Sequence, residues 1–278
     1  EARELSYLFF LFYCKASGGL LVLLAAGPGG AQQVLFRGGL HQAASRLAED
    51  LGDRIRLESP VASVQQDDDR VVVTTTSGEE VVAQRAVVAL PPPLAAEIDW
   101  TPQLPQSRRR LLERQAMGST IKAWLAYPEP FWRRRGLNGF LTDDESPFDP
   151  VFDVTPPGSP VGLLAGFFES VRGRELAAAT PQQRRDAAVA TLVRHLGPEA
   201  ASPVDYVDQD WTAERWSRGC YGATMAPGVL TTVGHLIREP HGRVHWAGTE
   251  TATVWSGYVE GALESGERAA AEVLGATG

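Results

Sequence analysis

The stretch of residues 244–261, near the end of the chain, constrains the fold more than any other part of the sequence. Residues 244–247 form a short apolar strand that runs into a Gly-Thr-Glu turn at 248–250. A polar loop follows, and a helix is expected to begin at about Tyr258. A strand, a glycine turn and a helix N-terminus point backbone N–H groups and a partial positive charge at one place. The arrangement predicts a binding site for a large cofactor.

The composition narrows the class of protein and its partners. The chain has 278 residues, 44% of them apolar, which suits one large domain or two ordinary ones with a substantial core. The net charge of −8 argues against nucleic acid and anionic membrane surfaces as partners. Two cysteines, Cys14 and Cys220, are too few for a disulfide framework and fit no metal site. No metal is expected, and a reducing, cytoplasmic setting is predicted.

Two apolar runs near the start, residues 8–12 and 20–24, invite an interpretation as a signal peptide or a membrane segment. Lys15 and the pair Gly18-Gly19 interrupt them, and neither run approaches the roughly 20 residues that span a bilayer. Both runs are therefore expected to lie in the core of a soluble protein.

Hydrophobic periodicity predicts helices and strands in comparable number. Helices are expected over residues 4–14, after the pair Gly38-Gly39, and over 181–196. The second of these is amphipathic, with one face made of Leu40, Ala43, Ala44, Leu47 and Leu51. Strands are expected over residues 20–26, 55–57, 61–65, 71–76, 80–90, 119–127 and 162–168. This pattern by itself favours an α/β or an α+β fold.

Three motifs follow one another in a fixed order along the chain. The first is Gly-Ser-Thr-Ile-Lys at 118–122 with Glu-Pro-Phe-Trp at 129–132. The second is Gly-Cys-Tyr at 219–221, preceded by Trp211. The third is Ala-Gly-Thr-Glu-Thr-Ala-Thr at 247–253 with Trp-Ser-Gly-Tyr-Val-Glu-Gly at 255–261. In this order they resemble the flavin-containing monoamine oxidase family. The resemblance covers essentially the whole chain, because residues 4–19 also resemble a family helix that ends in a glycine pair.

One motif of that family is missing from this sequence. The family begins with a strand, a Gly-x-Gly-x-x-Gly turn and a helix that together hold the FAD pyrophosphate. Gly-Pro-Gly-Gly at 27–30 has the wrong spacing, and Pro28 lacks an N–H donor. The chain therefore resembles the C-terminal part of such an oxidase, without the N-terminal dinucleotide-binding motif.

The resemblance implies a fold that is α/β plus α+β. It consists of an incomplete FAD-binding domain of the amine oxidase type and a substrate domain built on a mixed sheet and helices. The substrate domain is expected over residues 1–36 and 111–213, and the FAD-binding domain over 37–110 and 214–278.

The resemblance also assigns roles that the pattern alone does not give. Cys220 reads by itself as a buried thiol, but the family cysteine in this motif is joined by a thioether to the flavin 8α carbon, which requires a thiolate. Tyr221 and Tyr258 would form an aromatic cage whose ring faces attract the amine. Lys122 reads as a solvated lysine on a strand. In the family it holds a water near the flavin and assists the reaction with oxygen.

Further residues of this chain match cofactor and substrate contacts of the family. Gln32 would line the substrate cavity with Tyr221 and Tyr258, Trp211 would lie beside the flavin ring, and the backbone of Val61 would meet the adenine. The helix that begins near Val259 would aim its N-terminus at the flavin. Gly261, Ala262 and Gly266 are expected to keep this helix close to its neighbours. The full set expected to bind FAD is Val61, Trp211, Cys220, Gly248, Thr249, Glu250, Trp255, Gly257, Tyr258 and Val259.

The implied function is FAD-dependent oxidation of a small-molecule amine to an imine and then an aldehyde, with oxygen reduced to hydrogen peroxide. One alternative is a non-catalytic or incomplete fragment that associates as a homo-oligomer, or that needs a complementary N-terminal chain to bind FAD. Another is a polyamine or amino-acid oxidase of the same fold. The apolar tail that anchors some family members is not found before Gly278, so no membrane anchor is expected.

Overall fold

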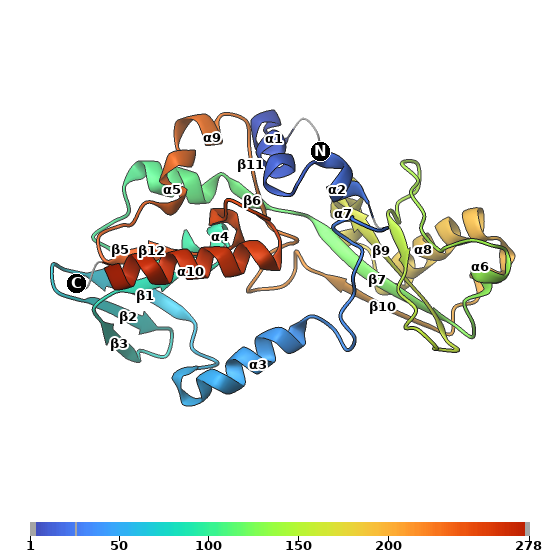
Figure 1. Ribbon diagram of the computed structural model, residues 1–278, viewed down its shortest axis with the longest axis horizontal. Coiled ribbons are helices and arrows are strands. Elements are labelled where there is room, and N and C mark those ends of the chain that lie inside the picture. Colours follow the sequence, from blue (N-terminus) through green and yellow to red (C-terminus); the bar gives the residue numbers. More distant parts are fainter. Residues whose placement is uncertain (1–3, 26, 276–278) are drawn as a thin grey trace. The chain divides into compact units, whose positions relative to one another are not determined.

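The computed structural model describes residues 4–25 and 27–275, which form two compact units (Figure 1). The first unit comprises residues 117–221. The second comprises the described residues of 2–116 and 222–278. Residues 4–25 and 27–36 thus group by contacts with the second unit, whereas the resemblance associates 1–36 with 111–213. Which unit serves FAD and which serves the substrate stays a prediction.

The first unit is built on a four-stranded antiparallel sheet in the order β10-β7-β9-β8. Its strands are β7 (Thr120–Tyr127), β8 (Val151–Asp153), β9 (Gly162–Glu169) and β10 (Asp205–Asp210). Buried and more exposed residues alternate along β7 and β9, as expected for strands with one face on a core. The predicted strands over 119–127 and 162–168 are confirmed.

Helix α8 (Pro181–Leu196) packs against this sheet. It begins with a capping box, in which Thr180 and Gln183 satisfy each other's backbone N–H groups. Its residues Ala188 and Leu192 are fully buried in one apolar cluster with Leu125 of β7. The predicted helix over 181–196 is therefore confirmed. The unit also contains α6 (Phe131–Arg134), α7 (Ser170–Ala177) and the 3₁₀-helix η2 (Pro198–Ala201).

The second unit contains another four-stranded sheet and two short strand pairs. The sheet has the order β3-β2-β1-β5, in which β1 and β5 are parallel and the other neighbours antiparallel. The pairs are β12 with β4, which are parallel, and β11 with β6. The strands are β1 (Val61–Gln66), β2 (Val71–Thr75), β3 (Glu80–Ala83), β4 (Ala86–Val88), β5 (Asp99–Thr101), β6 (Gln115–Met117), β11 (Ala223–Met225) and β12 (Val244–Trp246).

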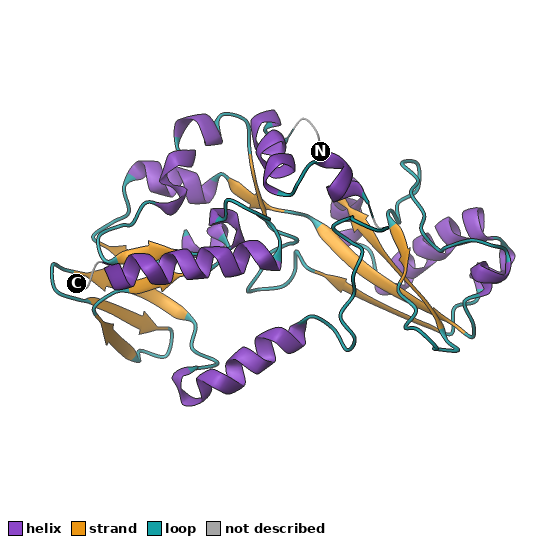
Figure 2. Cartoon of the chain, in the orientation of Figure 1, coloured by secondary structure: helices purple, strands orange, loops and turns teal. Residues whose placement is uncertain are grey.

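The helices of the second unit differ widely in length (Figure 2). They are α1 (Tyr7–Ala16), α2 (Leu20–Leu24), α3 (His41–Leu51), α4 (Pro92–Ala95), α5 (Gln106–Glu113), α9 (Val229–Thr232) and α10 (Val259–Gly275), with the 3₁₀-helices η1 (Gly52–Arg54), η3 (Gly234–Arg238) and η4 (Thr249–Thr251). Helices thus alternate with both parallel and antiparallel strand pairs, which confirms the predicted combination of α/β and α+β architecture. Among the described residues, no helix has the length and apolar character needed to cross a membrane.

The core of the second unit fixes strand β12, which leads into the Gly-Thr-Glu turn. Val244 and Trp246 of β12 are buried with Val64, Val71 and Trp100 of the neighbouring sheet. The rings of Trp100 and Trp246 lie 5.7 Å apart. Burial of several large side chains at roughly 2 kcal/mol each makes this the main stabilising contact of the strand.

The first strand prediction, over residues 20–26, is wrong. Residues Leu20–Leu24 form helix α2, and position 26 lies outside the described residues. Backbone bonds from Leu23 N to Gly19 O and from Ala25 N to Leu21 O have the i to i−4 spacing of an α-helix. A short apolar run has no period that separates helix from strand, and here local hydrogen bonding decides it.

The strand predictions that follow are only partly right. The predicted strands over 61–65 and 71–76 correspond to β1 and β2. The single strand predicted over 80–90 is divided into β3 and β4, which pair in different directions with different partners. Residues 55–57 form no strand, and Leu57 is 80% exposed. The apolar run over residues 80–90 therefore contains two strands that pair with β2 and with β12. The sequence of the run does not show this, because the pairing depends on segments far away in the chain.

The expected burial of the apolar helices is also wrong in part. Of α1, only Phe9 and Ala16 are buried, and α2 has no buried residue. The predicted amphipathic helix exists as α3, yet none of its residues is buried, and Leu47 is 55% exposed. Helices α2 and α3 therefore have no buried residue, whereas α1 packs through Phe9 against Leu111, Met225 and Val229.

Candidate functional site

Lys122 and Tyr221, both predicted site residues, lie together in the first unit. The Lys122 ammonium lies 4.7 Å from the centre of the Tyr221 ring and 5.7 Å from the centre of the Phe167 ring. The two rings meet edge to face at 5.8 Å. Lys122 on β7 is the direct register partner of Phe167 on β9. A cation near two aromatic rings is an electrostatically favourable arrangement.

Glu169 joins this group and was not predicted from the sequence. The Tyr221 hydroxyl donates a hydrogen bond of 2.8 Å to Glu169 Oε1. Burial raises the pKa of the Glu169 carboxyl and the negative charge of Asp149 adds to this, whereas the Tyr221 hydrogen bond and Lys122 oppose it. Alternation along β9 places Phe167 and Glu169 on one face of the strand. This alternation is the sequence feature from which Glu169 could have been predicted to lie beside Phe167.

Cys220 lies beside the start of β7. Its backbone N–H donates to Gly118 O at 2.9 Å, and its carbonyl accepts from Thr120 Oγ1 at 3.2 Å. A Cβ at Gly118 would run into the Cys220 carbonyl, so only glycine permits this approach. Burial raises the pKa of the Cys220 thiol, and the charge of Lys122 partly offsets this effect. Cys220 is a free, half-buried thiol, as is Cys14.

Trp211 follows β10 and is anchored to the same segment. Its backbone N–H donates to Thr120 O at 3.2 Å. The indole Nε1 is buried, and within the described part of the chain it has no hydrogen-bond acceptor. A buried donor without an acceptor costs about 1–3 kcal/mol unless a ligand supplies one. This atom is therefore suited to an acceptor edge of a bound group.

The predicted Gly-Thr-Glu turn exists in the second unit and closes on the loop before α10. Gly248 N donates to Ser265 Oγ at 3.0 Å, which ties the turn to the helix. The Thr249 hydroxyl accepts from Gly257 N at 2.7 Å and donates to Tyr258 O at 2.8 Å. Glu250 Oε1 accepts from Ala223 N at 3.2 Å. The turn and the start of α10 therefore form one rigid element.

Tyr258 is held by two aromatic neighbours within the second unit. Trp255 meets it edge to face at 5.1 Å, and Tyr13 of α1 stacks on it at 6.4 Å. Burial and a side-chain hydrogen bond with Tyr258 raise the pKa of Tyr13. Trp255 N also donates to Ala16 O at 2.9 Å, so α1 is attached to this loop twice. Tyr13 was not predicted, and no local pattern distinguishes it from the other aromatic residues of α1.

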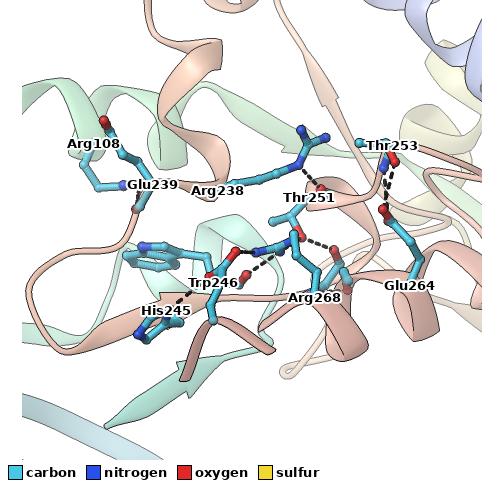
Figure 3. A network of polar contacts seen from close by, with 12 residues as sticks. Arg108, Arg238, Glu239, His245, Trp246, Thr251, Thr253, Glu264 and Arg268 are labelled. Atoms are coloured by element: carbon cyan, nitrogen blue, oxygen red, sulfur yellow. Dashed lines mark hydrogen bonds and ion pairs between the residues drawn. The ribbon is translucent and has the colours of Figure 1, made fainter. Parts of the chain in front are cut away.

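A polar network holds helix α10 against strand β12 and the turn (Figure 3). Arg268 donates to Trp246 O at 2.7 Å and to Thr251 Oγ1 at 2.9 Å. His245 Nδ1 lies 3.0 Å from Glu272 Oε2, and Glu272 also pairs with Arg268. Because the helix carries these partners along its length, its N-terminus is fixed in position relative to the turn.

Of three small residues expected to hold α10 close to its neighbours, only Gly261 does so. Its Cα is buried against the Trp255 carbonyl and Ala252. Ala262 and Gly266 are exposed, and nothing lies within 4 Å of a Cβ placed at Gly266. The expectation was wrong for these two positions because helical spacing does not reveal which face meets a neighbour.

The two glycines of α10 provide a matched test of this packing. Gly261→Ala should lower the free energy of unfolding by about 1–3 kcal/mol, because the new methyl group must displace backbone. Gly266→Ala should raise it by about 0.5–1 kcal/mol, because alanine favours the helix. Urea unfolding monitored by circular dichroism measures both values. Equal effects of the two substitutions would contradict the packing described here.

Comparison with known proteins shows the family of this chain. Residues 3–274 match the profile of the family described as flavin containing amine oxidoreductase. The chain is 40% identical over 281 residues to the flavin-containing amine oxidase of Danio rerio, covering 100% of this chain and 54% of the fish protein. It is also 40% identical to flavin-containing amine oxidase A of Bos taurus, covering 100% of this chain and 53% of that protein. The chain belongs to the flavin-containing amine oxidase family.

Two solved structures of the amine oxidase fold are similar to this one. Cyclohexylamine oxidase from Brevibacterium oxydans superposes with a TM-score of 0.91 at 35% identity, over 97% of this chain and 60% of that chain. Putrescine oxidase bound to putrescine has a TM-score of 0.88 at 29% identity, over 95% of this chain and 59% of that chain. Membership of this oxidoreductase family implies FAD as the cofactor, as predicted. The chain spans about half the length of the curated relatives it matches.

Two predicted residues of this amine oxidase chain are not joined to the groups described above. Gln32 is exposed and follows α2, where its backbone N–H donates to Ala25 O. Val61 opens β1 opposite Thr75. Within the described residues, no hydrogen bond, ion pair or ring contact links either of them to the other predicted residues of the second unit. Their roles toward substrate and adenine stay predictions.

Proposed function

We propose that the chain forms part of an enzyme that oxidises a small-molecule amine to an imine, which water hydrolyses to an aldehyde, while oxygen is reduced to hydrogen peroxide. The observation that carries this proposal is the group formed by Lys122, Tyr221 and Cys220 within one unit. A cation, an aromatic face and a thiol meet there in a chain that belongs to an amine oxidase family. Family membership by itself does not say whether Lys122, Tyr221 and Cys220 lie close together in this chain.

The residues present are suited to FAD. In the first unit, Cys220 offers a thiol for attachment and Trp211 offers a buried donor without an acceptor. In the second unit, the turn at Gly248 leads to α10, whose first N–H groups lack intrahelical acceptors and favour a negatively polarised partner. Bound FAD would supply the electron-accepting chemistry, and the protein supplies position and electrostatics.

The protein residues would each do a limited task in this reaction. Tyr221 and Tyr258 are proposed to present aromatic faces to the amine and to limit access of water. Lys122 is proposed to hold a water and to provide the positive charge that favours the reduction of oxygen. No residue needs to act as an acid or base in carbon–hydrogen cleavage, because the oxidising power belongs to the cofactor.

Reconstitution tests whether this chain by itself carries out the proposed reaction. The purified chain is incubated with FAD, freed of unbound cofactor by gel filtration, and mixed with hexylamine in the presence of a peroxide-coupled dye. A yellow protein that produces peroxide in proportion to hexylamine is the expected result. A protein that stays colourless, or a yellow one without peroxide production from any amine tested, would contradict catalysis by this chain alone.

A second hypothesis is that the chain needs a further polypeptide segment to hold FAD. The exposed apolar face of α3, which includes Leu40, Leu47 and Leu51, supports it, because uncovered faces of this kind favour association. The sequence also lacks the glycine motif expected for the pyrophosphate. This hypothesis predicts that FAD binding appears only when the part of the Danio rerio enzyme that this chain does not match is co-expressed with it. Self-association through the same face would instead appear as a dimer by light scattering.

A further inference from the structure

Glu169 lies beside the aromatic ring of Tyr221 in the first unit. It is the last residue of β9, and two positions before it on the same face is Phe167. Tyr221 donates to its Oε1 at 2.8 Å. No hydrogen bond to its Oε2 is found among the residues that the structure describes. Tyr221 is 55% exposed, so a small molecule can reach this group in the folded chain.

The described residues that act on the Glu169 carboxyl carry charges of both signs. Lys122 acts on it with a positive charge, and Asp149 acts on it with a negative charge. The Asp149 backbone N–H donates to Phe167 O at 2.8 Å, which fixes this second carboxylate close to β9. The charges of Lys122 and Glu169 also act on the Cys220 thiol. A cationic ligand at Oε2 would add a favourable positive charge beside the carboxylate.

Two other carboxylates, Asp208 and Glu272, differ from Glu169 in that each is paired directly with a cationic side chain. Asp208 forms two hydrogen bonds of 2.8 and 2.9 Å with Arg184 and accepts another from Tyr206. Glu272 is paired with both His245 and Arg268, and these partners lower its pKa despite burial. Within the described part of the chain, Glu169 forms no ion pair in direct contact, and burial raises its pKa. Ionisable side chains whose pKa is shifted by burial in this way are concentrated at functional sites.

We propose that Glu169 is a specificity-determining residue that binds a second ammonium group of the substrate, so that the enzyme prefers diamines to monoamines of equal length. The inference rests on the proposed function. Oε2 would accept a hydrogen bond from the distal ammonium, on the side of the carboxylate away from the Tyr221 hydroxyl. A monoamine would leave the carboxylate without this partner and would bury an alkyl end beside a charge.

A comparison of hexylamine with 1,6-diaminohexane tests the proposal on the FAD-loaded enzyme. The wild-type enzyme should have a kcat/KM about 10- to 100-fold higher for the diamine, the range that one hydrogen bond between charged groups provides. In Glu169→Gln the ratio of kcat/KM for the diamine to kcat/KM for hexylamine should fall to about one, through a higher KM for the diamine. Glu169→Asp, which keeps the charge, should retain part of the preference. Glu129→Gln, which removes a surface partner of Arg134, serves as the control.

The Glu169→Gln variant should remain folded, because the buried, ionised carboxylate lowers the stability of the folded protein. A carboxyl whose pKa is raised in the folded state makes the protein lose stability as the pH rises from the unfolded pKa through the folded one. Glu169→Gln should therefore melt at the same or a higher temperature than the wild type at pH 7, and the difference should shrink toward pH 4. A purely structural role for Glu169 predicts the opposite sign.

Calorimetric binding separates failure of this inference from failure of the proposed function. If the chain oxidises no amine, yet binds 1,6-diaminohexane more tightly than hexylamine in a manner lost in Glu169→Gln, the role of Glu169 stands and the oxidase proposal falls. If the enzyme oxidises hexylamine and the diamine equally, or if Glu169→Gln slows both to the same extent, the proposed specificity is overturned while the oxidase function stands.

Discussion

The Cys220→Ala protein is expected to release its flavin on denaturation, whereas the wild type is expected to retain it through a thioether. The wild-type holoprotein precipitated with acid is expected to give a yellow pellet, because a thioether survives unfolding. The Cys220→Ala pellet should be colourless, with all of the flavin in the supernatant. Absorbance spectra of the two fractions measure the effect, which is all or none.

The second cysteine provides the matched control for this experiment. Cys14→Ala should keep the yellow pellet, because Cys14 lies on α1 and is assigned no role in attachment. Because burial raises the pKa of the Cys220 thiol, little thiolate exists at neutral pH. Attachment in the wild type should therefore become faster as the pH rises toward that pKa. A colourless wild-type pellet would show that the flavin is not covalently held.

Lys122→Met is expected to slow the reaction of the reduced enzyme with oxygen by about 100-fold or more, the loss typical of removing one preorganised electrostatic group. Methionine keeps much of the length and apolar surface of the side chain but removes the charge near Tyr221 and Glu169. Stopped-flow mixing of the anaerobically reduced enzyme with oxygenated buffer measures the rate. The step that reduces the enzyme should be much less affected.

The chain has two lysines, so the control for Lys122→Met is Lys15→Met. Lys15 is exposed in the last turn of α1, and its removal should leave the reaction with oxygen unchanged. An oxygen rate in Lys122→Met within twofold of the wild type would refute the role assigned to Lys122. The same substitution removes the cation that opposes the raised pKa of Cys220, so flavin attachment should also become slower.

The candidate site could be predicted from the sequence where its residues are close together in the chain. The turn that contains Gly248, Thr249 and Glu250, and the helix that begins at Val259, depend on local hydrogen bonds and helix signals. Phe167 and Glu169 could not be assigned in this way, because their relation to Lys122 and Tyr221 depends on strand register and on a distant loop. Tyr13 reaches Tyr258 only through the packing of α1.

The sequence by itself determined the family, the cofactor class and the elements with a clear period, including β7, β9, α8 and α10. These features depend on short-range patterns, which neighbouring residues establish without help from the rest of the chain. Only the tertiary structure decided that residues 20–24 form a helix, that the run 80–90 is shared between two strand pairings, and that α3 lies uncovered. It also decided that the Lys122–Tyr221 group includes the carboxylate of Glu169. The helix at residues 20–24 is held by hydrogen bonds within that segment, which a short apolar run does not reveal. Each of the other outcomes depends on which distant segment pairs with a backbone edge, covers an apolar face or meets a charge, and no local pattern records that choice.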